Sequence, residues 1–395
     1  MGDQPVGAKR RGSLTKLSAV GGVLFLAACG DTGTSGTNTP TATPTAVCQG
    51  TTAPPGYSNG VAMVPGEATS LSGAGSTFVN PMMQQWSSTF ATSNGVQVAY
   101  QSIGSGAGIK QLQAGTVDFG ATDAFMTDTD IAAAKGPVVQ IPMVQAPVVV
   151  AYNLPGVAGG LKFDGETLGK IFAGQIVTWN DPAIASLNSG VTLPATPIAV
   201  AHRSDGSGTT FIFTDFLTKE STSWVTALGG ATKSVGKTVA WPVGTGGKGN
   251  EGVSAAVGQT QGGLGYVELG YAISQHLTYG NIKNKAGTFV EPCIKSAANA
   301  TVGITNYPND LRIDIVDATT SPQAYPITGL TWALIYQEQT NAGKSAALVN
   351  FLSWVLTKGQ DLTTQLNYTP LGSDLQKLCV AQLHKITLNG TPVAT

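Results

Sequence analysis

Three apolar segments of the chain are each followed by a glycine-rich turn, and apolar residues at helical spacing follow each turn. The segments and turns, in chain order, are residues 68–72 with 73–78, residues 96–100 with 104–108, and residues 197–201 with 204–208. Apolar runs of this length predict strands, and apolar residues three or four positions apart predict helices. The pattern therefore predicts three strand–turn–helix units.

The helix expected after the first turn has clear limits. Pro81 suits a first helical turn, and Asn94-Gly95 ends the helix. The second helix is expected to begin at Ile109 and to end at Gly115. Residues 117–121 predict a further strand with Thr122-Asp123-Ala124 just past its carboxyl end, which is where ligands bind in open α/β sheets.

The third turn has the chemistry of an anion site. Ser207, Gly208 and Thr209 stand where the helix opens, and the first N–H groups of a helix have no intrahelical partners. Arg203 adds a planar cation that can hold two oxygens at once. The alternative is an ordinary packing turn, with Asp205 or Ser207 as N-cap. Because three such turns occur with one arginine and two aspartates, the pattern favours an oxyanion site.

Composition and charge narrow the class of protein. The 395 residues are 42% hydrophobic and only 11% charged, and glycine accounts for 51 of them without a fixed period. Such a chain can bury a large core. Beyond residue 28 it holds 17 basic and 21 acidic residues, a net charge of about −4. Nucleic-acid binding would call for a basic surface, so we expect no nucleic-acid partner.

The first 28 residues have the layout of a secretory signal. Basic residues 9–16 precede an apolar run, residues 17–28, that is too short to span a bilayer. The run ends in Leu-Ala-Ala-Cys at residues 26–29, which resembles a bacterial lipobox and predicts lipidation of Cys29. Ordinary signal cleavage beside a coincidental cysteine is the alternative. Residues 29–67 are rich in Thr, Pro and Gly and predict a tether.

The remaining cysteines and the histidines predict neither a particular disulfide nor a metal site. An oxidising compartment permits one disulfide among Cys48, Cys293 and Cys379, but the spacing does not say which pair forms. Neither the cysteines nor the three histidines have metal-site spacing, so we expect no metal and no cofactor.

Several sequence blocks occur together in a characteristic order. They are residues 73–78 (GAGSTF), 100–106 (YQSIGSG), 117–123 (VDFGATD), 203–209 (RSDGSGT), 246–252 (GGKGNEG), 262–268 (GGLGYVE), 325–328 (YPIT) and 366–368 (LNY). This order resembles the phosphate-binding proteins that supply Pst-type ABC importers. The resemblance spans roughly residues 70 to 380.

The resemblance implies a set of phosphate-binding residues. They are Thr77, Phe78 through its backbone, Ser105, Asp123, Arg203, Ser207, Gly208 and Thr209. Asp205 would orient Arg203. The chain departs from the common pattern at Gly106-Ala107 and at His202, so the resemblance implies no role for these residues.

The implied fold is α/β, with two lobes of the periplasmic-binding-protein type (type II solute-binding proteins) and the ligand between them. We expect residues 68–147 and 325–395 to form lobe I and residues 148–324 to form lobe II, with crossings near 145–150 and 321–325. A ligand that contacts both lobes would favour the closed state. The implied function is extracytoplasmic capture of phosphate, with arsenate as an analogue, by a lipid-anchored monomer that delivers it to the permease and ATPase of an importer.

Two other functions stay open on the sequence alone. A hydrolase would need Ser105 or Ser207 as nucleophile, but neither lies in Gly-x-Ser-x-Gly, and strand alternation turns His202 away from Arg203. The glycine-rich residues 244–249 resemble a phosphate loop but have Gly249 in place of Ser or Thr. A surface lipoprotein that binds phosphate as a sensor or adhesin, without transport, is the other alternative.

Overall fold

The computed structural model describes Cys48 and residues 59–394, which belong to one compact unit of the chain, residues 39–395. The predicted signal peptide, Cys29 and most of the predicted tether lie outside the described residues. No helix in the described part of the chain is long and apolar enough to cross a bilayer.

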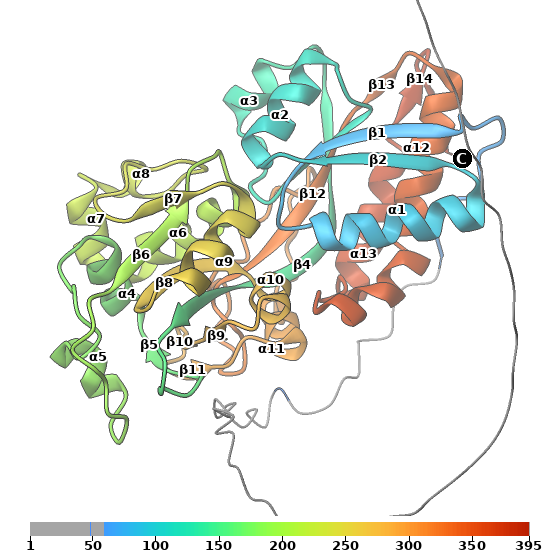
Figure 1. The fold of residues 1–395 in the computed structure, drawn as a ribbon. Coiled ribbons are helices and arrows are strands. Elements are labelled where there is room, and N and C mark those ends of the chain that lie inside the picture. Colours follow the sequence, from blue (N-terminus) through green and yellow to red (C-terminus); the bar gives the residue numbers. More distant parts are fainter. Residues whose placement is uncertain (1–47, 49–58, 395) are drawn as a thin grey trace, which may run out of the picture. The chain divides into compact units, whose positions relative to one another are not determined.

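Nine of the described strands form one continuous sheet (Figure 1). The strand order is β2-β1-β3-β12-β4-β8-β6-β7, and β9 also pairs with β4. The bounds of these strands are β1 (Ser70–Gly75), β2 (Gln97–Ser102), β3 (Phe119–Thr122), β4 (Val138–Asn153), β6 (Ala199–Arg203), β7 (Thr245–Gly247), β8 (Gly263–Glu268), β9 (Thr278–Tyr279) and β12 (Thr328–Tyr336). Two small sheets are made of β5 (Lys162–Phe163), β10 (Asn281–Lys283) and β11 (Phe289–Val290), and of β13 (Glu338–Gln339), β14 (Thr387–Leu388) and β15 (Thr391–Pro392).

Helices lie between most of these strands. The longer ones are α1 (Asn80–Asn94), α2 (Ser105–Ala114), α4 (Gly165–Phe172), α6 (Gly208–Glu220), α9 (Gly249–Gln259), α12 (Ala342–Val355) and α13 (Ser373–Leu383). The shorter ones are α3 (Asp128–Ala132), α5 (Pro182–Leu187), α7 (Thr222–Ala227), α8 (Ala231–Ser234), α10 (Leu269–Ser274), α11 (Ile294–Ala298) and the 3₁₀ helices η1 (Asn299–Thr301) and η2 (Lys358–Leu366).

Strand β4 joins the two halves of the sheet. Residues 138–147 pair with β12, whereas residues 148–153 pair with β8. Almost every residue of β4 is buried, in keeping with its continuous apolar sequence, because both faces of this strand are covered. The change of pairing partner falls between Pro147 and Val148. The lobe boundaries stay a proposal, and we keep the names lobe I and lobe II for the residues given above.

A bulge interrupts the pairing of β4 with β12. The register shifts between Thr331 and Trp332, so that Thr331 pairs with Val144 while Trp332 pairs with Pro142. Proline cannot donate a ladder hydrogen bond, and bulges are one of the few places within a sheet that accept it. Bulges also redirect side chains near binding sites. Thr331 lies at this bulge, and its hydroxyl contacts Asp123, as described below.

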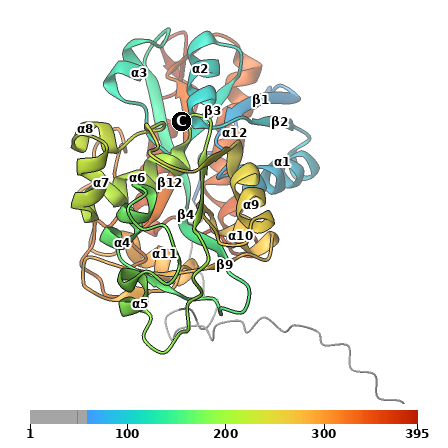
Figure 2. The same ribbon diagram turned by 60° about the vertical axis from the view of Figure 1, so that its left-hand side comes forward.

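The two faces of the lobe II half of the sheet carry different helices. Val149 and Ala151 of β4 belong to a cluster that includes Val253 and Val257 of α9. The intervening residues of β4 belong to the larger cluster, which contains the apolar side chains of α6. Because successive side chains of a strand point to opposite faces, α6 and α9 cover opposite sides of β4 (Figure 2).

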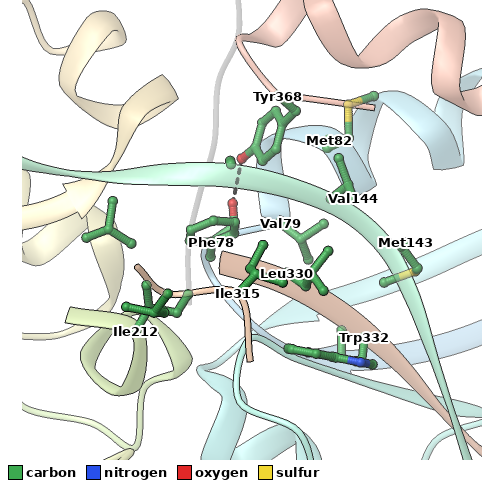
Figure 3. Packing of buried hydrophobic residues seen from close by; sticks show 14 of the residues in the cluster. Phe78, Val79, Met82, Met143, Val144, Ile212, Ile315, Leu330, Trp332 and Tyr368 are labelled. Carbon is green, nitrogen blue, oxygen red and sulfur yellow. Dashed lines mark hydrogen bonds between the residues drawn. The ribbon is translucent and has the colours of Figure 1, made fainter. Parts of the chain in front are cut away.

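The larger cluster continues from one lobe into the other. Figure 3 shows Ile212 of α6 in lobe II near Phe78, Leu330 and Ile315, with Tyr368 and Val144 on the other side of Phe78. All of these side chains are buried. Apolar packing therefore continues across the junction between the lobes.

Several predicted strand limits are shifted by a few residues; β6, for example, is Ala199–Arg203 rather than 197–201. Two of the shifts concern glycines that were expected in turns. Strand β1 continues through Gly73 and Gly75, which were expected to form a turn, because both pair with β2 and β3. At Gly73 a Cβ atom would overlap the ring of Phe119. Helix α2 begins at Ser105 rather than at Ile109, so Gly108 is helical; a Cβ there would overlap the backbone of β1. Glycines at these two positions allow close packing.

The beginning of the folded body and the disulfide could not be predicted in detail. Residues Val61 and Val64, within the predicted tether, donate backbone hydrogen bonds to Ser353 and Asn350 of α12, so the folded body begins earlier than residue 68. Cys48 is bonded to Cys293, which the sequence left open, and Cys379 is a buried free thiol. The disulfide attaches a residue of the predicted tether to lobe II.

Candidate functional site

The three predicted strand–turn–helix units are present, and they carry most of the predicted site residues. Strand β1 leads to α1, β2 leads to α2, and β6 leads to α6. Thr77, Ser105 and Ser207 lie in or directly after these three turns, and Asp123 directly follows β3. Strands β1, β2 and β3 run parallel, so their carboxyl ends meet at one edge of the sheet.

Asp123 lies at the centre of a group of hydroxyls. Its side chain is buried, with 2% of the residue exposed. Atom Oδ1 accepts hydrogen bonds from Ser76 Oγ at 2.5 Å and from Thr331 Oγ1 at 2.7 Å. Atom Oδ2 accepts only a longer one, from Ser105 Oγ at 3.3 Å. Oδ2 is therefore the oxygen with acceptor capacity left for a ligand.

Burial changes the acidity of this carboxyl group. Loss of water around Asp123 raises its pKa to about 6. The hydrogen bonds from Ser76 and Thr331 and the positive charge of Arg203 act in the opposite direction and limit the rise. At pH 7 the group is mostly ionised, and it can then only accept hydrogen bonds.

Arg203 ends β6 and is held in place by two neighbours. Its Nε and NH2 atoms donate to the two carboxylate oxygens of Asp205 at 2.8 and 2.6 Å, and NH1 donates to Thr209 Oγ1 at 3.3 Å. The guanidinium has five N–H groups, and these three bonds leave others for an anion. Arg203 is 4% exposed, so its charge acts where little water screens it.

Asp205 has the geometry expected of the residue that orients Arg203. Besides its paired bonds with the guanidinium, its Oδ1 accepts a hydrogen bond from the N–H of Gly249 at 3.1 Å. Burial by itself would raise the pKa of Asp205, but the hydrogen bonds and charge of Arg203 outweigh it and lower the pKa below its usual value. Asp205 is therefore a stable anion that fixes the direction of the guanidinium.

The turn before α6 contains the N-cap of this helix and a glycine that packs closely against lobe I. Ser207 is the N-cap, and its Oγ accepts a hydrogen bond from the N–H of Thr210 at 3.0 Å. The hydroxyl hydrogen stays available for a ligand. At Gly208 a Cβ atom would overlap Asp123. Only glycine allows the start of α6, in lobe II, to approach the carboxylate of lobe I this closely.

Hydrogen bonds join the lobes around the site. Asn250 donates to Thr77 Oγ1 and to Thr209 Oγ1, which belong to different lobes. The N–H of Gly106 donates to the carbonyl of Gly206 at 2.9 Å. Outside this group, Lys237 of lobe II pairs with Asp130 of lobe I at 3.0 Å. The two lobes are thus in direct contact around the site, and Gly106, for which the sequence indicated no role, takes part.

Phe78 contributes to the core through its ring and to the junction through its backbone. Its carbonyl accepts a hydrogen bond from Tyr368 OH at 2.5 Å, which Figure 3 shows. The same hydroxyl lies 3.1 Å from Glu268 Oε2, at the end of β8 in lobe II. Tyr271 OH donates to the carbonyl of Thr77 at 2.6 Å. The first turn is therefore held by two tyrosines; Tyr368 lies in the block 366–368, but the sequence analysis gave neither tyrosine a role.

The described residues offer no support for a catalytic centre of the hydrolase type. The ring of His202 stacks on Trp241 with centroids 4.9 Å apart. No group of three His, Cys, Asp or Glu side chains within the described ranges is arranged to hold a metal ion. What the site offers is hydrogen-bond donors from two lobes around one acceptor.

Sequence analysis missed residues that complete this arrangement. They are Ser76, Thr331, Asn250, Glu268, Tyr271 and Tyr368. Ser76, Asn250, Glu268 and Tyr368 lie inside the blocks quoted above. A block does not show which of its residues contact a ligand and which support those residues. The sequence marks Thr331 only weakly, because it is one of few polar residues in the apolar strand β12. Its pairing with Asp123 joins residues 208 positions apart.

The fold and the site define a solute-binding protein of the periplasmic-binding-protein class. Residues 41–358 match the family model described as the PBP superfamily domain, and the chain belongs to that superfamily. Within it, the chain belongs to the PstS family. It is 39% identical to the phosphate-binding protein PstS of Xylella fastidiosa, over 79% of this chain and 84% of that protein. It is 40% identical to PstS of Pasteurella multocida, over 80% of this chain and 90% of that protein.

A solved structure agrees on the fold. The phosphate-binding protein of Stenotrophomonas maltophilia superposes with a TM-score of 0.62, over 80% of this chain and 94% of that one. The two sequences are 19% identical, so this likeness speaks for the fold alone.

Proposed function

We propose that the protein captures inorganic phosphate outside the cytoplasmic membrane, between lobe I and lobe II, and delivers it to the permease and ATPase subunits of an ABC importer. Membership of the PstS family supports this function, since the relatives are named phosphate-binding proteins. They are named as binding proteins, not as enzymes, and we propose binding without turnover.

The observation that carries the proposal is the buried carboxylate of Asp123 among donors from both lobes. The proposed phosphate-binding residues are Thr77, Phe78, Ser105, Asp123, Arg203, Ser207, Gly208 and Thr209. Apart from Asp123, they supply hydroxyl, N–H and guanidinium donors, and phosphate oxygens accept such bonds. The start of α6 adds N–H groups and the positive end of the helix dipole.

Closure follows from the division of these residues between the lobes. Thr77, Ser105 and Asp123 lie in lobe I, whereas Arg203 and Thr209 lie in lobe II. A phosphate ion that contacts both sets binds the closed state more tightly than an open state and shifts the population toward closure. Small-angle scattering is expected to show a decrease in dimensions when phosphate is added.

Asp123 supplies selectivity in this proposal. Phosphate carries at least one P–OH at neutral pH, and ionised Asp123 can accept that proton in a hydrogen bond through Oδ2. Sulfate has no proton at this pH, so its oxygen would face the carboxylate as an unpaired acceptor. Sites built around one required hydrogen bond can reject an analogue that lacks it by roughly 10⁴-fold. Arsenate is protonated like phosphate and is expected to bind.

Calorimetric titration with phosphate, arsenate and sulfate tests the proposal. We expect the unmodified protein at pH 8 to bind phosphate and arsenate and to exclude sulfate. Asp123→Asn introduces an amide that can donate to sulfate, so the exclusion weakens. Lowering the pH through 6, the pKa of Asp123, has the same effect because the protonated carboxyl group can also donate.

A matched control comes from the same lobe. Asp118→Asn changes a carboxylate that also accepts hydrogen bonds, from Ser72, but it pairs with Lys344 and not with a proposed binding residue. The ratio of phosphate affinity to sulfate affinity in Asp118→Asn should equal that of the unmodified protein. Sulfate affinity within tenfold of phosphate affinity in the unmodified protein, or full discrimination in Asp123→Asn, would contradict the role of Asp123.

Three finer points are part of the proposal. Cys29 is lipidated and anchors the protein to the outer face of the cytoplasmic membrane; this residue lies outside the described residues. The protein acts as a monomer. Permease subunits and the ATPase are its macromolecular partners.

A further inference from the structure

One buried amide touches proposed phosphate-binding residues of both lobes. Asn250, the second residue of α9, is 0% exposed. Its Nδ2 atom donates to Thr77 Oγ1 at 2.9 Å and to Thr209 Oγ1 at 3.3 Å. Its backbone N–H also donates to Thr77 Oγ1, at 3.2 Å. Thr77 belongs to lobe I and Thr209 to lobe II, so this amide joins them.

A hydrogen bond to the side-chain oxygen of Asn250 fixes the orientation of its amide. Asn250 Oδ1 accepts a hydrogen bond from the backbone N–H of Glu268 at 3.0 Å. A backbone N–H can only donate, so the oxygen of the amide must face Glu268. The NH₂ group then faces the two threonines. A rotated amide would leave the buried N–H of Glu268 facing a donor, which is costly.

This direction determines what the threonine hydroxyls can do. A hydroxyl accepts up to two hydrogen bonds and donates one. Thr77 Oγ1 accepts from the backbone N–H and the side chain of Asn250. Thr209 Oγ1 accepts from Asn250 Nδ2 and from Arg203 NH1. Each hydroxyl has both acceptor positions filled, and its hydrogen is the only part that can bind anything else.

We propose that Asn250 is a positioning residue that makes the hydroxyls of Thr77 and Thr209 hydrogen-bond donors toward the bound oxyanion. This inference rests on the proposed function, because a hydroxyl fixed as a donor benefits an oxyanion ligand. Asn250 thereby gives two threonines in different lobes the same polarity. Once the lobes close, both hydroxyls can meet one anion without competing for a proton.

Asn250→Asp reverses this polarity with almost no change in shape. One carboxylate oxygen still accepts the N–H of Glu268, and the other accepts from the threonine hydroxyls, which turns their hydrogens away from the anion. Each hydrogen bond to a charged partner contributes roughly 10-fold or more in affinity, so we expect a loss of phosphate affinity on the order of 100-fold. At pH 5 the introduced carboxyl group, once protonated, can donate one bond, so the loss relative to the unmodified protein becomes smaller.

A negative charge near the anion could weaken binding by repulsion alone, and a second background separates the two causes. Thr209→Val removes one of the hydroxyls on which Asn250 acts. In this background Asn250→Asp should cost several-fold less affinity than in the unmodified protein, because only Thr77 is left to be reversed. Repulsion alone predicts the same loss in both backgrounds, and that result would overturn the inference.

A further variant controls for the added negative charge. Asn284→Asp adds the same charge to a buried amide with a similar bonding pattern, from Asn284 Nδ2 to Ser321 and Ala324 and from the N–H of Thr288 to Oδ1. None of these partners is a proposed binding residue, and the phosphate affinity of Asn284→Asp should stay within threefold of that of the unmodified protein.

If Asn250→Asp does not fold, as judged by thermal unfolding, the uncharged Asn250→Leu replaces it. We expect about tenfold weaker binding for Asn250→Leu, since both hydroxyls become free to rotate.

The outcomes separate this inference from the proposed function. If the unmodified protein binds phosphate and Asn250→Asp, or its replacement Asn250→Leu, binds within threefold of it, the inference is wrong and the proposed function stands. If the unmodified protein does not bind phosphate, the proposed function is wrong and the inference fails with it. Calorimetric titration at pH 8 and pH 5 measures all of these affinities.

Discussion

Glu268 is a fully buried carboxyl group at the junction of the lobes. It ends β8 and is the N-cap of α10, where its Oε1 accepts the N–H of Gly270 at 2.8 Å. Its Oε2 lies 3.1 Å from the hydroxyl of Tyr368, which comes from lobe I. The nearby Asp123 carries a like charge, which disfavours ionisation of Glu268.

Burial raises the pKa of Glu268 to about 8, and the negative charge of Asp123 adds to the increase, while the bonds from Gly270, Tyr368 and Tyr271 act against it. These hydrogen bonds favour the ionised form, but burial outweighs them, and the carboxyl group is mostly neutral at pH 7. Tyr368 OH has one hydrogen, and the carbonyl of Phe78, at 2.5 Å, is the nearer acceptor. The same hydroxyl lies 3.1 Å from Glu268 Oε2, so its hydrogen is shared between a near acceptor and a more distant one.

The raised pKa predicts how stability changes with pH. In the unfolded chain the group ionises near its ordinary value of 4.5, whereas in the folded protein it stays protonated to about pH 8. Between these values the folded state binds one proton more, so the free energy of unfolding falls by about 1.4 kcal/mol per pH unit. The contribution of neutral Glu268 is complete below pH 4.5 and is lost as the pH rises through 8. Over the whole range it amounts to about 5 kcal/mol.

Glu268→Gln tests this reasoning because glutamine has the shape of the neutral acid and cannot ionise. Its amide can donate to Tyr368 and accept from Gly270, so we expect stability close to that of the unmodified protein at pH 6. From pH 6 to pH 8 the unmodified protein should lose about 2 kcal/mol relative to the variant. Urea unfolding at half-unit steps of pH measures the difference.

A matched control removes an exposed carboxylate. Glu338 is fully exposed and its pKa is lowered by a hydrogen bond from Thr387, so it is ionised in both states throughout this window. Glu338→Gln should therefore parallel the unmodified protein from pH 6 to pH 8. If the curve of Glu268→Gln were also parallel to that of the unmodified protein, the argument for a neutral buried Glu268 would be refuted.

The remaining predictions concern the ligand and the anchor. Phosphate at a hundredfold excess over its dissociation constant should stabilise the unmodified protein by about 2.7 kcal/mol in thermal unfolding. Arg203→Ala should lose most of this gain because it removes the buried guanidinium that we propose as a phosphate ligand. An undiminished gain in the variant would count against the proposed site. Cys29→Ser should release the mature protein from the membrane and abolish labelling with a radioactive fatty acid. If the serine variant retained the label, lipidation at Cys29 would be excluded.

Local sequence patterns were sufficient for the elements that carry the site. Each strand–turn–helix unit follows from neighbouring residues, since the period of the apolar positions, the glycines and the capping residue act within a few positions of one another. The pairing of Arg203 with Asp205 joins residues two positions apart, and the structure contains the pair as expected. The position of Ser207 at the opening of α6 was likewise predictable.

Residues that only tertiary contacts bring together escaped this reasoning. Thr331 reaches Asp123 because β12 pairs with β3, and Asn250 reaches Thr77 across the junction of the lobes. The disulfide between Cys48 and Cys293 spans 245 positions, and a spacing gives no preference among three cysteines at such distances. Glycines at 73 and 108 were taken for turn residues, whereas their lack of a side chain serves packing against Phe119 and β1.

The sequence by itself therefore determined the elements, the donors at the start of the helices and the family, because these depend on local patterns and on blocks of adjacent residues. The tertiary structure decided which groups surround Asp123, which cysteines pair, and how acidic each buried carboxyl group is. Desolvation and hydrogen bonding depend on every chain segment around a group, and the raised pKa values of Asp123 and Glu268 arise only when distant segments exclude water from them.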